Sequence, residues 1–176
     1  MLQSQPKPLP VIQIVGYKNS GKTTLVAAMV RLLKTTGYRV GTVKHDAHDF
    51  TMDHPGTDTW QHQEAGADVT AISSARRTAV LTNQPATLDQ LLAQMHDIDI
   101  ALVEGFKQER YPKLVLIRKA DDLPLLDQLD NIRTVIVWPE MEALATEGSC
   151  DYPIVRLRET STIYATLIHT TRLDRS

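Results

Sequence analysis

The segment from residue 11 to residue 36 constrains the fold of this chain more than any other. Residues 16–23 read Gly-Tyr-Lys-Asn-Ser-Gly-Lys-Thr, which is the pattern G-x-x-x-x-G-K-[ST]. The apolar, β-branched run Val11–Val15 precedes this pattern, and residues 22–36 carry apolar side chains at helical spacing. A buried strand, a glycine-rich loop and a helix in this order form a phosphate-binding loop, or P-loop.

The P-loop predicts binding of a nucleoside triphosphate or a molecule built like one. In such a loop the backbone N–H groups surround an anion at the N-terminus of a helix. Lys22 is predicted to reach the β- and γ-phosphates, and the Thr23 hydroxyl is predicted to hold Mg²⁺. The alternative is that the glycines only form a tight turn.

Length and composition indicate one soluble globular domain. The chain has 176 residues, of which 42% are hydrophobic and 23% are charged, and its net charge is −2. This charge argues against a general role on nucleic acid or on a membrane surface. The single cysteine, Cys150, excludes an internal disulfide, and no run approaches the roughly 20 apolar residues of a membrane span. We expect a flexible lead-in at residues 1–10, a single nucleotide-binding domain at 11–176, and a cytoplasmic protein.

Beyond the P-loop, apolar strand-like runs alternate with helical patterns. Strands are expected at 38–43, 68–73, 77–81, 99–103, 114–117 and Ile132–Val137, and helices at 57–65, 88–95 and 159–168. This alternation predicts an α/β chain with the three-layer P-loop NTPase fold and a mostly parallel central sheet. Ligands of such sheets bind beyond the carboxyl ends of the strands. We therefore expect the P-loop, residues 44–46 and residues 104–105 to converge on one site.

A P-loop also needs a carboxylate for its magnesium ion. Glu104 follows four apolar residues of an expected strand, which is the usual position of this carboxylate, with Glu in place of Asp. Asp99 begins the same strand, about 15 Å from its other end, and is therefore excluded. The alternative for Glu104 is a charged residue where the strand reaches solvent. Asp46 is a second candidate, for the metal or for orienting the attacking water, and Lys44 is placed to neutralise phosphate charge.

Histidines gather in sequence around Asp46. This set resembles a transition-metal cluster, although no pair has the H-x-x-x-H spacing and no cysteine accompanies it. The alternative is a polar loop whose imidazoles form local hydrogen bonds. The residues concerned are His45, Asp46, His48, Asp49, His54 and His62.

Residues 118–121, Arg-Lys-Ala-Asp, carry Lys119 and Asp121 at the spacing of the [NT]-K-x-D loop that reads guanine in many GTPases. Arg118 replaces the usual Asn or Thr. The alternative is a solvated charged turn, and these residues alone do not separate GTP from ATP.

The sequence resembles the MobB family of molybdopterin-guanine dinucleotide biosynthesis adaptor proteins. Lys-Asn-Ser inside the P-loop is characteristic, as are Lys-His-Asp with a following His and Val-Glu-Gly-Phe-Lys. The matching blocks follow the family order up to about residue 118: residues 15–25, 40–48, 56–59, 65–67, 102–107 and 112–113. One departure is Thr57, where many relatives are expected to have Lys.

The resemblance implies a homodimer that binds GTP with Mg²⁺ and is at most a slow GTPase. It further implies that the chain assists the guanylyltransferase that attaches GMP to molybdopterin, or delivers the finished cofactor to molybdoenzymes or their chaperones. Glu104 and Asp46 would lie beside the metal with Thr23, and Lys22 and Asp46 are the candidates for a catalytic role. The residues implied to contact the nucleotide are Gly16, Tyr17, Lys18, Asn19, Ser20, Gly21, Lys22, Thr23, Thr24, Lys44 and Lys107.

Two other functions share these motifs. A small-molecule kinase would use Asp46 as the base, but residues 76–92 are too short and too apolar for the arginine-bearing lid of a kinase. A metallochaperone GTPase would use the histidines. Slow hydrolysis fits the absence of an evident arginine finger in the sequence, although Arg76 or Arg110 of a second subunit could supply one.

Overall fold

The structure is a computed structural model that describes residues 8–46, 49–144 and 150–173. These residues form two compact units. The first contains the residues up to His45 and from Leu92 onward, and the second is Asp46–Leu91. This division does not test the prediction of one domain over residues 11–176, which stays a prediction.

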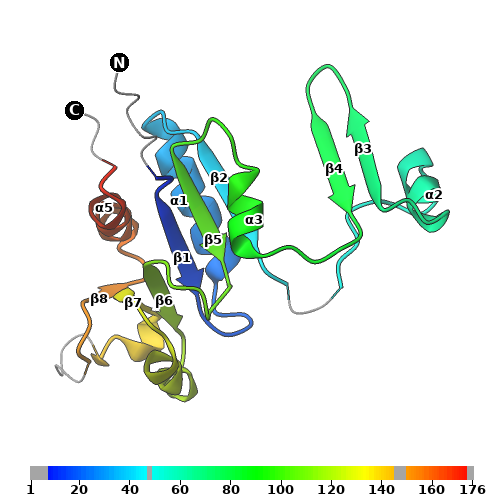
Figure 1. Cartoon of the computed structure of the whole chain (residues 1–176). Coiled ribbons are helices and arrows are strands. Elements are labelled where there is room, and N and C mark those ends of the chain that lie inside the picture. Colours follow the sequence, from blue (N-terminus) through cyan, green and yellow to red (C-terminus); the bar gives the residue numbers. More distant parts are fainter. Residues whose placement is uncertain (1–7, 47–48, 145–149, 174–176) are drawn as a thin grey trace. The chain divides into compact units, whose positions relative to one another are not determined.

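The first unit is built on a six-stranded sheet in which every pair of neighbouring strands is parallel. The strand order is β2-β5-β1-β6-β7-β8, and the central strands are labelled in Figure 1. The predicted α/β fold with a mostly parallel central sheet is confirmed. The strands are β1 (Val11–Val15), β2 (Val40–Lys44), β5 (Ile100–Glu104), β6 (Lys113–Ile117), β7 (Ile132–Val137) and β8 (Ile154–Arg156).

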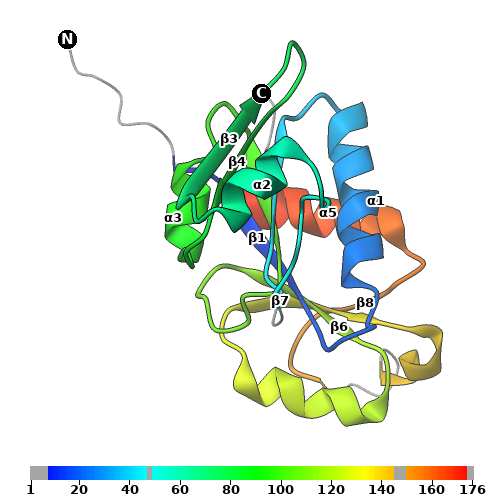
Figure 2. The same ribbon diagram turned by 90° about the vertical axis from the view of Figure 1, so that its right-hand side faces the viewer.

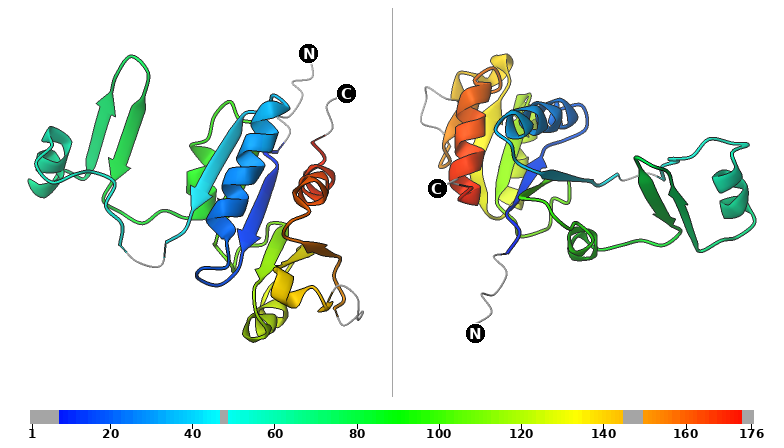
Figure 3. Two further views of the ribbon diagram at one scale, coloured as in Figure 1. Left: turned by 180° about the vertical axis from the view of Figure 1, so that it is seen from behind. Right: turned by 90° about the horizontal axis from the view of Figure 1, so that it is seen from above.

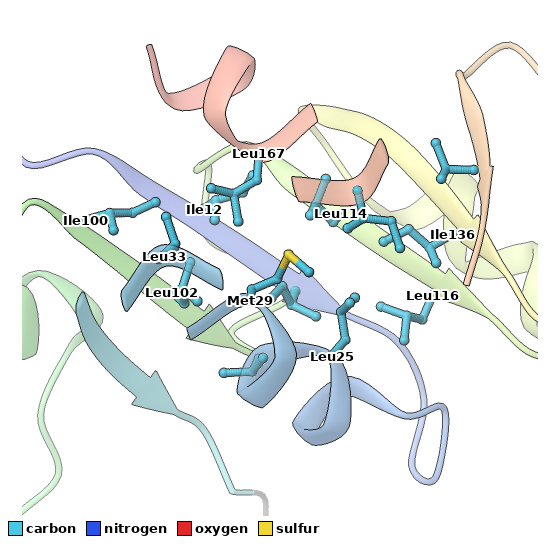
Figure 4. Packing of buried hydrophobic residues seen from close by; sticks show 14 of the residues in the cluster. Ile12, Leu25, Met29, Leu33, Ile100, Leu102, Leu114, Leu116, Ile136 and Leu167 are labelled. Atoms are coloured by element: carbon cyan, nitrogen blue, oxygen red, sulfur yellow. The ribbon is translucent and has the colours of Figure 1, made fainter. Parts of the chain in front are cut away.

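Helices α1 (Lys22–Thr35) and α5 (Thr160–Thr171) cover one face of this sheet. Figure 4 shows Met29 of α1 and Leu167 of α5 beside strand residues such as Ile12, and all three are buried. The central strands β1, β5 and β6 are buried on both faces, as is typical of parallel strands. The core therefore fixes where α1 begins, and with it the position of the P-loop.

The opposite face is covered over β6 and β7 by η1 (Ala120–Gln128), a 3₁₀ helix. Leu125 of η1 packs in one cluster with Val115 and Val135. Figure 2 shows η1 on the other side of these strands from α1. Helix, sheet and helix give the three layers that the sequence predicted.

The sequence missed β8 and η1. β8 has only three residues, which is too few to show an alternating pattern, and η1 is a charged segment with Pro124 inside it. Strand β2 begins at Val40 rather than at residue 38, because the backbone N–H of Tyr38 still bonds to the Leu33 carbonyl at the end of α1. Cys150, the one cysteine, is a half-buried free thiol.

The second unit holds the antiparallel pair β3 (Val69–Ser73) and β4 (Thr78–Thr82), with α2 (Asp58–Glu64) (Figure 3). The prediction of two neighbouring strands here is confirmed. Thr57 is the N-cap of α2, and its hydroxyl oxygen accepts a hydrogen bond from the Trp60 backbone N–H at 3.3 Å. This gives Thr57 a structural role at the position where relatives are expected to have Lys. Helix α3 (Leu88–Ala93) spans the sequence boundary between the units.

In the described part of the chain, no helix is both long and apolar enough to cross a membrane.

Candidate nucleotide-binding site

The loop between β1 and α1 is shaped to receive an anion. Asn19 and Gly21 both have positive φ angles, 62° and 91°. Gly21 is the N-cap of α1 and offers no side-chain hydrogen bond, and the first turn of the helix contains no acidic residue. The N–H groups of this turn and the positive end of the helix dipole therefore favour a negatively charged ligand.

The first glycine of the loop is required by close packing. A Cβ on Gly16 would lie 2.5 Å from Ser20 Oγ and 3.0 Å from the backbone oxygen of Leu116. Since Leu116 lies inside β6, this oxygen cannot move without disturbing the sheet. We expect Gly16→Ala to lower the free energy of unfolding by about 1–3 kcal/mol, as measured by urea denaturation.

Gly41 provides the matched control. A Cβ there would meet only the ends of two flexible side chains, Ile98 Cδ1 and Met95 Sδ, each at 2.6 Å. Because these ends can rotate away, Gly41→Ala should cost less than Gly16→Ala. An equal or larger loss at Gly41 would contradict this account of the loop.

Lys22 lies folded over the P-loop. Its Nζ donates a hydrogen bond to the Tyr17 carbonyl at 2.7 Å. Burial lowers the pKa of Lys22, the Glu104 carboxylate opposes this, and the positive charges of Lys107 and Lys44 lower the pKa further. Two further ammonium groups thus lie close enough to act on Lys22, which suits a ligand with several negative charges.

Lys107 and Lys44 approach the loop from two other segments. Lys107 Nζ lies 4.2 Å from the centroid of the Tyr17 ring, a cation–π contact, and burial lowers its pKa. Lys44 ends β2 and pairs in register with Glu104. The structure therefore brings both predicted phosphate-binding lysines to the same edge of the sheet as Lys22.

Thr23 and Glu104, the two oxygen ligands predicted for Mg²⁺ in the first unit, are in contact. Thr23 Oγ1 donates a hydrogen bond to Glu104 Oε1 at 2.8 Å. Glu104 is only 7% exposed, unlike a residue that merely marks where a strand reaches solvent. Asp99 lies at the other end of β5, where it accepts a hydrogen bond from the Arg39 backbone. A hydroxyl and a carboxylate are hard oxygen donors of the kind Mg²⁺ prefers, so the donor set fits this ion.

The turn after Glu104 is fixed by β1 and by the end of β2. Gln13 Nε2 donates to the carbonyls of Gly105 and Phe106, at 3.0 and 2.6 Å. The His45 backbone N–H donates to the Glu104 carbonyl at 2.9 Å, and the His45 ring lies 4.8 Å from that of Phe106. The strand end is thereby held, and with it the Glu104 carboxylate.

Two residues that the sequence did not assign to the phosphate site contact the P-loop backbone. Arg118 Nη1 donates to the Asn19 carbonyl, and Trp138 Nε1 donates to the Ser20 carbonyl, each at 2.8 Å. The Arg118 guanidinium also lies 4.6 Å from the Trp138 ring centroid. Each residue directly follows a strand, β6 or β7. In the sequence Arg118 belonged to the predicted guanine-reading turn, and the position after a strand was the only signal for Trp138.

The predicted guanine-reading turn is charged and exposed. Lys119 Nζ forms an ion pair with Asp121 Oδ2 at 2.9 Å, and both side chains are largely exposed. Asp122, not Asp121, is buried, and its carboxylate accepts hydrogen bonds from the backbone N–H groups of Arg118 and Lys119. This is the geometry of a solvated charged turn, and a guanine-reading role for Asp121 stays a prediction.

The residues around Asp46 are divided between the two units. Asp46 begins the second unit and His45 belongs to the first, so the role of Asp46 beside the metal stays a prediction. His48 lies outside the described residues. Within the residues that the structure describes, no three His, Cys, Asp or Glu side chains gather as metal ligands.

The sequence matches a known protein family. The model of the MobB family, described as molybdopterin guanine dinucleotide synthesis protein B, matches residues 11–138. The chain belongs to the MobB family. The match runs past residue 118, where the resemblance in the sequence became indistinct, and it includes both Arg118 and Trp138.

Two bacterial adapter proteins of molybdopterin-guanine dinucleotide biosynthesis are similar to this chain over most of their length. The molybdopterin-guanine dinucleotide biosynthesis adapter protein of Haemophilus influenzae is 34% identical over 151 residues, 83% of this chain and 77% of that protein. The adapter protein of Escherichia coli is 39% identical over 116 residues, 62% of this chain and 66% of that protein.

Solved MobB structures share the fold. The crystal structure of a MobB homologue from Bacillus stearothermophilus has a TM-score of 0.74 and 35% identity, and the match covers 94% of this chain and all of that one. Bacillus subtilis MobB has a TM-score of 0.72 and 28% identity, with 93% and 98% coverage.

Proposed function

We propose that this chain is a GTP-binding, weakly GTP-hydrolysing adaptor of molybdenum cofactor biosynthesis in the cytoplasm. In this role it assists the formation or delivery of molybdopterin guanine dinucleotide. The observation that carries the proposal is the contact between Thr23 and Glu104 at the uncapped N-terminus of α1, with Lys22 beside it. The pathway rests on the relatives, which are adapter proteins of molybdopterin-guanine dinucleotide biosynthesis.

In the proposed complex, the Thr23 hydroxyl and the Glu104 carboxylate hold Mg²⁺, which neutralises charge on the β- and γ-phosphates. Lys22 exchanges the Tyr17 carbonyl for phosphate oxygens, a stronger charge-assisted interaction. The backbone of the P-loop and the first turn of α1 bind the remaining phosphate oxygens. Lys44 and Lys107 add positive charge at the edge of this site.

Hydrolysis of GTP is expected to be slow. An arginine finger contributes a factor of about 10³–10⁵ to the rate of GTP hydrolysis. Arg118 contacts the P-loop, but it is engaged with the Asn19 carbonyl and the Trp138 ring. A subunit that places no guanidinium on the γ-phosphate is expected to turn over GTP at a rate on the order of 10⁻³ s⁻¹ or slower. Such a protein acts through the nucleotide that it holds rather than through rapid GTP hydrolysis.

We further propose that the chain acts as a homodimer, and the second unit supports this. Val69, Ala71 and Val80 lie on the same face of the hairpin, and Val69 and Val80 are 53% and 60% exposed. A two-stranded hairpin is only marginally stable by itself in water. A second copy of the chain that covers this face would remove the apolar surface from water and stabilise the hairpin.

Val80→Lys is expected to weaken the dimer at least tenfold, because it places a charge in the apolar face. Sedimentation equilibrium should give twice the chain mass for the wild type and a concentration-dependent shift toward the chain mass for the variant. Glu64→Lys, at an exposed position of α2, is the control and should leave the mass unchanged. A wild-type protein that sediments as a monomer at all concentrations would contradict the dimer.

The adaptor role is tested in a reconstituted reaction. A molybdopterin guanylyltransferase is incubated with its cofactor substrate and GTP, with or without this chain, and a molybdoenzyme apoprotein is the acceptor. The chain should increase the amount of dinucleotide formed or the amount transferred to the acceptor, and Lys22→Gln should not. If the chain changes neither quantity, the adaptor role is wrong.

A further inference from the structure

The order of the strands fixes which way a bound triphosphate points, if the proposed function is correct. Glu104 is the last residue of β5, which pairs with one edge of β1. Arg118 and Trp138 follow β6 and β7, which lie on the other side of β1. A magnesium ion held by Glu104 and Thr23 would neutralise charge on the β- and γ-phosphates. The γ-phosphate would then lie toward β5. The nucleoside must then extend toward β6 and β7.

The connections between the strands predict the same direction for the bound triphosphate. The chain leaves β1 toward β2 on one side and leaves β6 toward β7 on the other. Ligands of open α/β sheets bind in the crevice at such a reversal, beyond the carboxyl ends of the strands. Here the reversal lies between β1 and β6, so a ligand is expected between the P-loop and the residues that follow β6.

Two planar side chains, Trp138 and Arg118, lie beside the P-loop at the carboxyl ends of β6 and β7. Trp138 is held against the loop by its hydrogen bond to the Ser20 carbonyl, and its Cζ2 lies 3.2 Å from the position of a Cβ on Gly21. Arg118 is held by its hydrogen bond to the Asn19 carbonyl, and its guanidinium lies over the Trp138 ring. Trp138 is only partly buried and Arg118 is exposed, so the pair keeps surface available for a ligand.

We propose that Trp138 and Arg118 form the surface on which the base of the bound nucleotide stacks. An indole ring and a guanidinium plane both stack on nucleobases, and such stacking tolerates any base. The two backbone hydrogen bonds orient the pair before the ligand arrives. The pair therefore binds either purine, and it contributes affinity for the nucleoside rather than selectivity for guanine.

A purely structural role predicts something different. If Trp138 only braces the P-loop through the Ser20 carbonyl, its loss must weaken the binding of every phosphate ligand equally. If it stacks on the base, its loss must weaken GTP and leave inorganic tripolyphosphate unchanged. Tripolyphosphate carries the phosphates of GTP without the nucleoside and is therefore the probe that separates the two roles.

The experiment uses the full chain with Trp60→Phe as the background, because Trp60 and Trp138 are its only tryptophans. Mg–GTP and Mg–tripolyphosphate are titrated by calorimetry and by tryptophan fluorescence. GTP is expected to quench Trp138 clearly more than tripolyphosphate does. Trp138→Ala should weaken GTP by about tenfold to a hundredfold and change tripolyphosphate less than threefold.

Trp138→Phe keeps an aromatic ring but removes the donor to the Ser20 carbonyl. This variant should retain GTP affinity within about threefold. It replaces Trp138→Ala in the test if the alanine variant does not fold. The stacking role would be overturned if Trp138→Ala or Trp138→Phe weakened the binding of both ligands equally. It would also be overturned if Trp138→Ala left GTP affinity unchanged, or if both ligands quenched the fluorescence of Trp138 equally. A parent protein that binds tripolyphosphate but not GTP would overturn it as well, whereas one that binds neither ligand would overturn the proposed function itself.

Discussion

Lys22→Gln is expected to lower the affinity for Mg–GTP by about tenfold to a hundredfold and to leave the nucleotide-free protein folded. Charge-assisted hydrogen bonds contribute about 1.5–3 kcal/mol each, and the variant loses those from Lys22 to the phosphates. In the nucleotide-free protein the same ammonium is partly buried against the Tyr17 carbonyl, and burial lowers its pKa. Its removal therefore costs binding much more than it costs stability.

The pH dependence of stability tests whether the Lys22 ammonium is partly buried in the folded protein. Because the pKa is lowered in the folded state, the folded protein binds fewer protons than the unfolded chain between that lowered pKa and 10.5. Stability should therefore rise with pH through this window. Lys107 and Lys113 share the direction of the shift, so Lys22→Gln should reduce the rise without abolishing it.

Lys34→Gln is the matched control, since Lys34 is an exposed lysine in the last turn of the same helix. It should leave GTP affinity unchanged in the calorimetric titration. The account of Lys22 fails if Lys22→Gln binds Mg–GTP as tightly as Lys34→Gln does.

Glu104→Gln is expected to remove most of the dependence of GTP binding on Mg²⁺. The glutamine oxygen can still accept the hydrogen bond from Thr23, so the fold should be retained. The variant lacks the negative charge that a divalent ion requires at this position. The ratio of GTP affinities with and without Mg²⁺ should therefore fall at least tenfold relative to the wild type.

Asp127→Asn, which neutralises an exposed carboxylate of η1, is the control and should keep the wild-type ratio. Thermal unfolding of the nucleotide-free Glu104→Gln variant shows whether the fold is intact. If an intact variant still responds to Mg²⁺ as the wild type does, Glu104 is not the carboxylate of the metal.

The sequence predicted the parts of the site that local pattern determines. The P-loop and the carboxylate at Glu104 each combine a short apolar strand with the residue that follows it, and such segments can be recognised one at a time. The structure adds that Thr23 and Glu104 touch, which follows from β1 and β5 being neighbours. The three-layer fold was predictable for the same reason, because strands and helices alternate along the chain.

Arg118 and Trp138 could not be assigned in this way. Their contact with the P-loop depends on β6 and β7 following β1 in the sheet, and strand order is a property of the whole fold. Nothing near Trp138 in the sequence distinguishes it from a residue that merely ends a strand. The second unit could not be recognised as separate for a related reason. The exposed valines of its hairpin have the same apolar pattern in the sequence as buried strands.

The central claim, that the P-loop with Glu104 holds a magnesium–GTP complex, is tested most directly by one calorimetric titration. The purified chain is titrated with GTP in the presence and in the absence of Mg²⁺, with ATP and GDP as competitors. The account predicts saturable binding of one GTP per chain that weakens when Mg²⁺ is removed and is displaced more weakly by ATP than by GTP itself. Failure to bind GTP, or tighter binding of ATP, would contradict it.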